Sequence, residues 1–428
     1  KLEMQHATES DDHGPSSGVM EMVDSVVEAT AGVPQGNSVS PVLFVIYIQA
    51  VLEGLDAAFE EAGVQRDKPV FRTKHDHVIH GRRYDAKRGV SSVEAGESMY
   101  ADDCCFAFVG RSQICSGAVV IDRHFTGFGL QIHRGRPGKK SKTECMYFAP
   151  AGMRYEDADT SNIPVDGGFY TFCKRFKYLG SIININLKAD DDVQTRIRAA
   201  TYAFNMMRKV LRGKRVVASK KASIYKAIVC SVLLYGSECW AMTQALLDKL
   251  EKFHNQCVRS MCRVTLGQQW HCHIRNRDLR KRFVTTNTRG ATTVLGTVQD
   301  MLTERNLRWA GHVARMPQTR LPRVLLSGWV EAPRPHGRPE QTFGHALKRS
   351  LVFRAKQLER EYPVGGTIAV KEGDLVTYVD AHQLAASLRK TSTLRRGDTG
   401  STWFQVAQNR KLWKVVVYKE FKGPIVPT

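Results

Sequence analysis

The amino-acid sequence predicts an α+β protein in which a strand-rich part precedes a helical part. A β-prone run, Ser98–Val109, carries two adjacent carboxylates, Asp102 and Asp103, between apolar residues. Further along, apolar residues such as Val193 and Ile197 recur every three or four positions, which is the spacing of an amphipathic helix. An apolar content of 42% in 428 residues is enough for a substantial core and two or three domains.

The net charge of +21 is unevenly distributed along the chain. Residues 1–60 contain one Lys and ten Asp or Glu, which gives −9, so the remaining residues carry +30. A basic excess of this size favours a polyanionic partner, above all nucleic acid, over a charge that serves solubility alone.

Ten cysteines without paired spacing are too sparse for a disulfide scaffold, and no secretory signal is visible. We therefore expect reduced thiols in an intracellular protein of the nucleus or cytoplasm that is not secreted. The longest apolar run, Val39–Leu52, is too short to span a bilayer, so no membrane partner is expected. The chain starts at Lys1 rather than Met, which suggests a fragment.

The first elements follow from turn residues and caps. Residues 1–25 are expected to form an acidic, disordered linker, with structure beginning near Val26. Ser40 as N-cap and Pro41 at the first helical position predict a mostly buried helix over Val42–Ala58. Residues 63–95 are polar and are expected to form an inserted hairpin or loop before the aspartate pair.

After the aspartate pair we expect a helix over Ser112–Phe128, a basic loop over Arg134–Lys142 and a strand over Glu144–Phe148. Four segments then have helical spacing: the one that starts near Asp190, Lys220–Tyr235, Ala245–Arg263 and Leu295–Ala314. The Pro-rich residues 317–339 are expected to form a linker or extended arm, followed by a tail of mixed character.

The doubled carboxylate needs a physical cause, because an isolated buried carboxylate costs several kcal/mol or becomes neutral. A bound Mg²⁺ is the commonest cause, since hard cations take oxygen ligands and offset the charge. The alternative is an ordinary polar hairpin tip.

Three motifs occur in a fixed order: Gly32–Pro41, Tyr100–Asp103 and Phe176–Gly180. With this order and spacing the chain resembles the reverse transcriptases of non-LTR (LINE-like) retrotransposons over about residues 30–350. The first segment is similar to the Gly-x-x-Gln-Gly-x-x-x-Ser-Pro motif of that family, the second to its catalytic Tyr-x-Asp-Asp box and the third to its primer grip.

Three further segments resemble the same family. Lys139–Met146 is similar to its lysine-bearing loop and strand, and Leu234–Trp240 and Leu307–Pro317 resemble thumb and post-thumb segments. The resemblance implies an incomplete palm with an antiparallel sheet and helices over residues 26–185, an all-helical thumb and post-thumb region over 186–316, and a linker and C-terminal extension over 317–428.

The resemblance implies an RNA-directed DNA polymerase that transfers nucleotides with two metal ions, Mg²⁺ or alternatively Mn²⁺. Its partners would be an RNA template, a DNA primer or target, and dNTP substrates. Asp102 and Asp103 would hold the metal, with Asp102 as the principal ligand, and Tyr100 would pack under the turn near the primer end. Gln35 and Gly36 would contact the nucleotide or template, because a side chain at Gly36 would block close approach to the backbone.

Other site assignments leave an alternative open. Lys142 is a candidate general acid for pyrophosphate or a phosphate contact, or a plain solvated lysine. Tyr178, Leu179 and Gly180 form the primer grip, or are core residues and a simple turn. The candidate phosphate contacts share a basic side chain on the helical part, where the alternative is a solvated helix face. They are Arg196, Arg198, Arg208, Lys209, Arg212, Lys214 and Arg215.

Two histidine and cysteine groups have spacing that suggests a metal site, and in both cases packing or surface residues are the better interpretation. The first group is His75, His77 and His80. The second is His254, Cys257, Cys262, Cys272 and His273.

A complete palm would supply another essential aspartate on an apolar strand upstream of the Gln-Gly motif, together with the fingers. Only Asp11, Asp12 and Asp24 precede that motif here. The first two fall in the expected linker, and Asp24 lies eight residues from Gly32, which is too near for the expected strand. We therefore expect the chain alone to lack polymerase activity. No endonuclease motif is recognisable. The alternative function is that of a non-catalytic nucleic-acid-binding protein derived from a retroelement.

Overall fold

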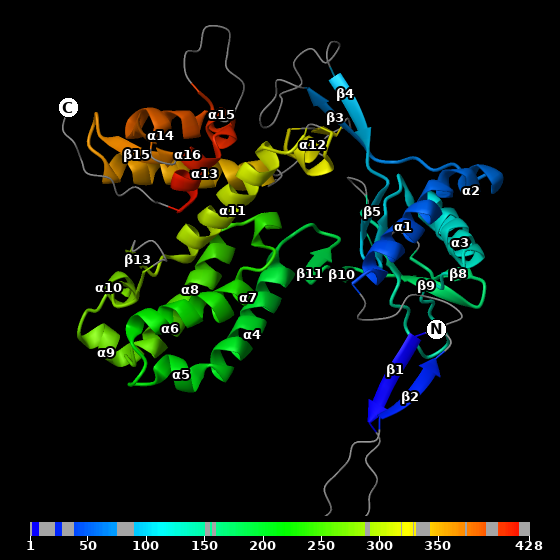
Figure 1. Ribbon diagram of the computed structural model, residues 1–428, viewed down its shortest axis with the longest axis horizontal. Helices are drawn as coiled ribbons and strands as arrows, with labels where there is room; N and C mark the ends of the chain where they lie inside the picture. Colours follow the sequence, from blue (N-terminus) through cyan, green and yellow to red (C-terminus); the bar gives the residue numbers. More distant parts are fainter. Residues whose placement is uncertain are drawn as a thin grey trace, which may run out of the picture. The chain divides into compact units, whose positions relative to one another are not determined.

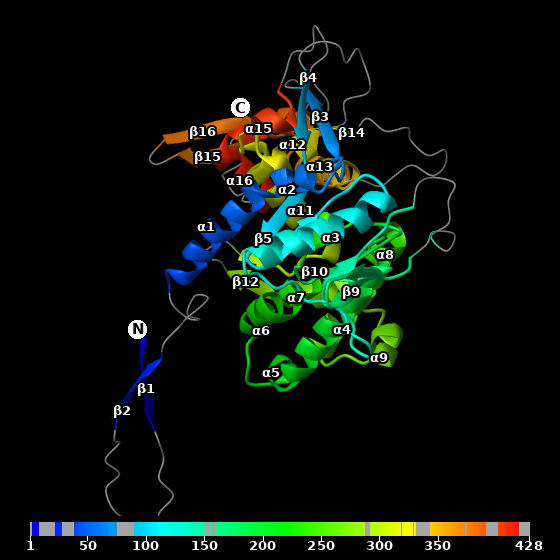
Figure 2. The ribbon, with the colours of Figure 1, turned by 90° about the vertical axis from the view of Figure 1, so that its right-hand side faces the viewer.

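The computed structural model describes residues 2–7, 22–27, 38–74, 90–149, 155, 160–286, 292–317, 319–327, 329–330, 343–372, 375–390 and 401–418 (Figures 1 and 2). The chain divides into two compact units. The first consists of Lys1–Lys68, Gly96–Arg136 and Ile163–Phe169, and the second of Pro69–Ala95, Pro137–Asn162 and Tyr170–Thr428.

The first unit packs helices against a short hairpin. Its elements are β1 (Leu2–Ala7), β2 (Met22–Val27), α1 (Ser40–Glu53), α2 (Leu55–Glu61), β5 (Glu97–Tyr100), β6 (Asp103–Phe106), α3 (Arg111–Gly127) and β8 (Ile163–Val165). Its core is apolar and consists of Ile48, Val51, Leu55, Phe59, Val120, Ile121 and Phe125. The expected helix over 112–128 and the strand–turn–strand around the aspartate pair are confirmed as α3 and β5–β6.

The linker expected over residues 1–25 is wrong where the structure describes that region. Strands β1 and β2 pair there in antiparallel register, so the described structure includes strands before Val26, and Asp24 lies on β2 opposite Gln5. Apolar residues alternate at Leu2 and Met4 of β1, and β2 contains three valines, features that favour strands over a linker.

Helix α1 is present but is not the mostly buried helix that the sequence predicted. Only Ser40, Ile48 and Val51 are buried in it, whereas Ile46 is 62% exposed. The N-cap is Val39 and not Ser40, and no side chain caps the helix. The apolar side chains of α1 point to all sides of the helix, but the rest of the first unit packs against one side only. By length and composition Ser40–Glu61 is apolar enough to cross a membrane, a test that core helices of soluble proteins also pass.

The second unit begins with short strands. The expected hairpin in 63–95 is confirmed by β3 (Val70–Lys74) and β4 (Val90–Glu94), which form a sheet with β14 (Trp329–Val330) in the order β14-β3-β4. Strands β10 (Arg175–Tyr178) and β11 (Ser181–Asn184) form an antiparallel hairpin. The expected strand over 144–148 is shorter, as β7 (Glu144–Cys145).

In the described residues the strands form separate two- and three-stranded sheets and not one larger antiparallel sheet. Strand β7 pairs with β9 (Gly168–Phe172) in parallel, because the long connection between them brings the chain back in the same direction.

The expected helical segments after residue 190 are confirmed. They are α4 (Asp190–Met206), α5 (Arg208–Arg212), α6 (Ala218–Ile224), the π-helix η2 (Tyr225–Cys230), α7 (Ser231–Leu233), the 3₁₀ helix η3 (Ser237–Cys239), α8 (Gln244–Met261), α9 (Leu266–His271), α10 (Asn276–Lys281) and α11 (Val298–Ala314). The region is not all-helical as expected, because β12 (Val284–Thr286) and β13 (Thr292–Val294) form a hairpin of β-branched residues.

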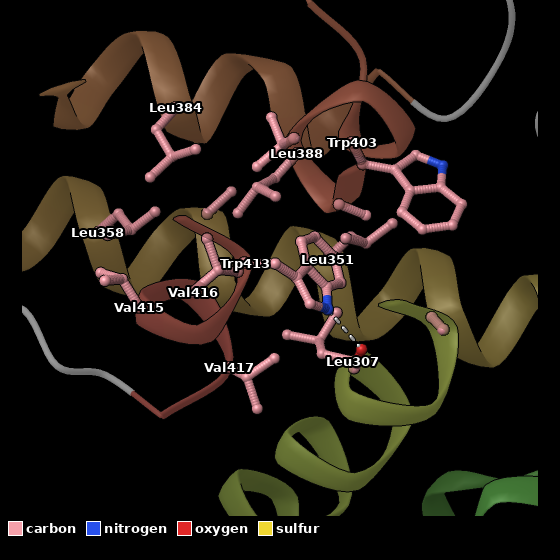
Figure 3. Packing of buried hydrophobic residues seen from close by; sticks show 14 of the residues in the cluster. Leu307, Leu351, Leu358, Leu384, Leu388, Trp403, Trp413, Val415, Val416 and Val417 are labelled. Carbon is pink, nitrogen blue, oxygen red and sulfur yellow. Dashed lines mark hydrogen bonds between the residues drawn. The ribbon is translucent and has the colours of Figure 1, made fainter. Parts of the chain in front are cut away.

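The linker and tail expected over 317–428 are also wrong in the described part. The elements there are α12 (Leu321–Ser327), α13 (Phe343–Glu361), β15 (Thr367–Glu372), β16 (Leu375–Asp380), α14 (Ala381–Arg389), α15 (Trp403–Gln408) and α16 (Arg410–Tyr418). They share one apolar core with α11, so the boundary at 316 falls inside this core. Figure 3 shows Leu351 and Leu358 of α13 packed with Trp403 and Trp413. Apolar residues that recur every three or four positions in these helices indicate packed helices. This pattern outweighs the Pro-rich residues, which suggested a linker.

Candidate catalytic turn and nucleic-acid surface

The aspartate pair lies at the tip of the β5–β6 hairpin. Tyr100 of β5 pairs with Asp103 of β6, so Ala101 and Asp102 form a two-residue turn. Ala101 has a φ of 54°, the positive value that such tight hairpin turns require at their first position. Asp102 and Asp103 are both exposed.

Strand register decides which side chains face the core. Residues opposite each other in an antiparallel pair share a face, and neighbours along a strand point to opposite faces. Met99 and Phe106 pack against the core of the first unit, so Tyr100 and Asp103 face outward. Tyr100 is 67% exposed, and the expectation that it packs under the turn is therefore wrong.

The turn carries negative charge that no described residue compensates by an ion pair. Burial and, after it, the charges of Asp103 and Asp102 raise the pKa of the neighbouring Cys104 thiol. Two exposed carboxylates fit a hard cation such as Mg²⁺, which binds through one or two carboxylates plus water and substrate phosphates. Asp102 and Asp103 would hold such a cation, which would offset their negative charge. Within the described ranges no group of three or more His, Cys, Asp or Glu could complete a metal site.

Arg66 holds the β5–β6 hairpin against the core of the first unit. Its side chain is 4% exposed and lies over the rings of Phe59, Phe106 and Phe108, at 5.2, 5.9 and 5.6 Å from their centroids. The guanidinium also forms a 2.6 Å ion pair with Glu97, the first residue of β5. This arginine therefore fixes both strands of the hairpin against α2.

The remaining residues expected at the site fall in different places. Gln35, Gly36 and the three histidines His75, His77 and His80 lie outside the described residues. Lys142 is exposed on the loop before β7 and belongs to the second unit. The primer-grip residues also belong to the second unit, whereas the aspartate pair belongs to the first.

The expected primer grip is a tight turn between β10 and β11. Leu179 and Gly180 both have positive φ, 46° and 84°. A Cβ on Gly180 would lie 3.3 Å from the Tyr235 ring, so glycine suits this position for two reasons. Leu179 is 38% exposed and Tyr178 is half-buried.

Both carbonyls of this turn are held by the helical part. The Tyr235 hydroxyl donates to the Leu179 carbonyl at 3.0 Å, and Arg196 donates to the Gly180 carbonyl. The Arg196 guanidinium also lies over the Tyr235 ring, 4.4 Å from its centroid. Arg196 is therefore a structural residue, and its interpretation as a phosphate contact is wrong.

The buried carboxylate of Asp192 connects the turn at Leu179 and Gly180 to the segment Leu234–Trp240. Asp192 accepts hydrogen bonds from the Ile182 backbone at 3.1 Å and from the Trp240 indole at 2.8 Å, and it lies 3.6 Å from Arg196. The sequence motif Leu234–Trp240 thus supplies two side chains that position the turn. Sequence spacing gave no sign of Asp192, because its partners are distant along the chain.

The helices that follow present a strongly basic surface. Residues 193–237 contain ten Lys or Arg and no Asp or Glu. The expected phosphate contacts Arg198, Arg208, Lys209, Lys214 and Arg215 are exposed, and Arg212 is half-buried. Helix α5 contacts α4, α6 and α8, so these cations occupy adjoining elements, as Figure 1 shows for the green helices. We call residues Arg198–Lys220 the basic surface.

Apolar side chains are interleaved with these cations. Tyr202 and Met206 are 69% and 67% exposed, and they continue the helical row that starts at Arg198. Such a mixture of exposed aromatic and basic side chains suits nucleic acid, whose bases stack and whose phosphates attract cations.

Helix α9 carries an exposed tryptophan that the sequence did not single out. Trp270 is 78% exposed and Leu266, one turn before it, is 68% exposed, while no residue of α9 is buried. The helix is held by a Thr265–Gln268 capping box. Arg263, just before it, donates to the Arg212 carbonyl at 2.7 Å, which attaches α9 to the basic surface. The sequence feature that could have pointed to this region is its charge, because residues 262–282 contain six Lys or Arg and one Asp.

The second histidine and cysteine group is divided between the core and the surface. His254 and Cys257 are buried, and Cys272 and His273 are exposed. The His254 Nδ1 lies 3.0 Å from the Tyr225 hydroxyl. Burial, with a smaller effect of Arg280, lowers the pKa of His254 from 6.5 to about 4, so the imidazole is neutral in the folded protein.

Comparison with known proteins gives one informative similarity. The chain is 32% identical over 206 residues to an uncharacterised transposon-derived protein of Caenorhabditis elegans. The match covers 47% of this chain and 64% of that protein, slightly less than two thirds of its length. No family model matches the chain, and no solved structure matches it. The chain is thus similar to a protein that is described as transposon-derived.

Proposed function

We propose that this chain is part of an RNA-directed DNA polymerase of a non-LTR retrotransposon and that its described helices bind the nucleic acid. The observation that carries the proposal is the basic surface, which contains seven Lys or Arg and lies within a longer stretch, residues 193–237, that has no Asp or Glu. Nucleic acid is the partner that such a surface attracts most strongly, because every phosphate contact releases condensed counterions.

The assignment to a polymerase is supported by the hairpin turn. Its two carboxylates are exposed together at the tip and have no described counter-ion, which is the environment that a catalytic cation requires. It is also supported by the turn at Leu179 and Gly180, which is held rigidly beside the basic helices. In the intact parent these parts would transfer nucleotides from dNTPs to a DNA primer on an RNA template.

Salt-dependent binding of an RNA–DNA hybrid by the whole chain tests the proposal. The affinity of the native chain should fall steeply with salt, and the double variant Lys214→Gln/Arg215→Gln should bind more weakly with a log–log slope reduced by about 1.8. The control Lys249→Gln/Lys252→Gln removes the same charge from the exposed side of α8 and should change affinity little. Equal effects of both double variants, or salt-independent binding, would contradict the proposal.

The second candidate is a non-catalytic nucleic-acid-binding protein. It is favoured by the absence, within the described ranges, of a third metal-binding side chain beside Asp102 and Asp103. Primer extension with Mg²⁺ or Mn²⁺ separates the two candidates. Extension that disappears in Asp102→Asn supports the polymerase, whereas binding without any extension supports the second candidate for this chain.

A further inference from the structure

The end of α11 and the start of α16 line an open, basic hollow of about 600 Å³. Basic side chains from three segments line it: His312 of α11 and Arg315 at the C-cap of that helix, Arg320 before α12, and Arg410 of α16. Met316 and Pro322 add an apolar side to the hollow. Among the residues that the structure describes, no Asp or Glu is part of this lining.

The segment Leu307–Pro317 builds this hollow with one face and the core with the other. Leu307, Ala310 and Val313 are buried in the core. A Cβ on Gly311 would lie 1.9 Å from the Trp413 indole nitrogen, so only glycine lets α16 approach this closely. That indole nitrogen donates to the Leu307 carbonyl at 2.9 Å, as the dashed line in Figure 3 shows.

The same packing holds Arg315 in place. Its guanidinium donates to the carbonyl of Ala407, at the end of α15, with a distance of 2.7 Å. Arg315 thereby remains at the wall of the hollow while Arg410 faces it from α16. The basic lining is thus part of a rigid frame and does not depend on mobile surface side chains alone.

The charges in the hollow repel each other. Burial and, after it, the charge of Arg410 lower the pKa of Arg315. Helix α16 also begins with Arg410 and Lys411, although cations at a helix N-terminus are unfavourable to the helix dipole. A bound anion would relieve both effects, and a phosphate group accepts the paired hydrogen bonds that arginine donates.

We propose that this hollow binds the phosphate groups of a nucleotide ligand, with His312, Arg315, Arg320 and Arg410 on the phosphates and Met316 and Pro322 against the sugar or base. The proposal deepens the proposed function, since the ligand is a segment of the bound nucleic-acid strand. A free nucleotide has the same phosphate chemistry, and the experiment below separates the two sources.

The test uses the full chain and the exposed arginines Arg320 and Arg410, because Arg315 also stabilises the fold. The affinity of Arg320→Gln/Arg410→Gln for a single-stranded oligonucleotide should fall at least about tenfold, the loss expected for one charge-assisted contact. Its salt slope should fall by about 1.4, the value for two single-strand phosphates. Lys414→Gln, an exposed cation of α16 outside the lining, is the control and should change affinity less than about twofold.

Inorganic pyrophosphate and a nucleoside triphosphate serve as the second set of probes. If they raise the melting temperature of the native chain but not of Arg320→Gln/Arg410→Gln, while strand affinity is unchanged, the phosphate site is supported and its ligand is a free nucleotide. If neither strand nor nucleotide binding depends on Arg320 and Arg410, the phosphate site is refuted. Continued weakening by Lys214→Gln/Arg215→Gln would then leave the proposed function intact. Absence of all nucleic-acid and nucleotide binding would overturn both.

Discussion

Replacement of Asp192 by Asn tests the network that positions the turn at Leu179 and Gly180. The carboxylate is 2% exposed and accepts two hydrogen bonds, from the Ile182 backbone and the Trp240 indole. Asn is nearly the same size but removes the charge that balances Arg196. The side-chain NH₂ group of Asn is also a donor, and both of its neighbours, the Ile182 N–H and the Trp240 indole N–H, are donors too, so one of the two hydrogen bonds is lost.

The expected loss can be estimated from these contacts. Removing one partner of a buried ion pair costs about 3–5 kcal/mol, and Arg196 keeps part of its environment through Gly180 and Tyr235. We therefore expect Asp192→Asn to lower the free energy of unfolding by about 3 kcal/mol. Urea unfolding followed by the combined fluorescence of the six tryptophans measures this loss.

Asp191→Asn is a matched control at the next position. Asp191 lies 3.5 Å from the exposed Arg175 and accepts from Asn184 at 2.9 Å, so its loss should cost at most about 1 kcal/mol. If the losses in free energy of unfolding for Asp192→Asn and Asp191→Asn differ by less than about 1 kcal/mol, the claim that the Asp192 network positions the turn is contradicted.

Three further predictions concern stability and binding. Because the unfolded state binds a proton more readily than His254 in the fold, the neutral imidazole contributes its full stability above pH 6.5 and loses it as the pH falls toward 4. Urea unfolding should thus show a loss of about 2 kcal/mol between pH 7 and pH 5 that His254→Gln abolishes, and an unchanged pH dependence would refute this. Gly311→Ala should cost about 3 kcal/mol in the same assay, because its Cβ collides with Trp413, whereas Gly267→Ala, with open space around it, should be neutral or stabilising; equal effects would contradict the packing. Trp270→Ala should weaken single-strand binding about tenfold and Trp270→Phe much less, if bases stack on α9; no loss in either variant would exclude stacking there.

Local spacing was enough to predict the helices α3, α4, α8 and α11 and the turn at Asp102 and Asp103. In each of these segments the periodicity of apolar residues is a property of the segment itself. The basic surface was partly predicted in the same way, because charge along a helix can be counted without knowing its neighbours.

Features that depend on distant partners could not be predicted. The exposure of α1 depends on how much of the rest of the protein covers it. A fully buried helix would have an equally apolar sequence, so the sequence alone does not separate the two cases. Arg196 has the spacing of a surface cation, but the carbonyl of Gly180 and the Tyr235 ring bury it. Trp403 and Trp413 form a core after a Pro-rich segment, and that segment alone suggested a linker.

The central claim is that the basic surface binds nucleic acid, and cross-linking tests it most directly. An RNA–DNA hybrid with photoreactive 4-thiouridine should be bound to the whole chain and irradiated, and the cross-linked peptides identified by mass spectrometry. We predict cross-links within Arg198–Lys220 that disappear at high salt. Cross-links confined to other elements, such as the outer faces of α13 and α14, would contradict the claim.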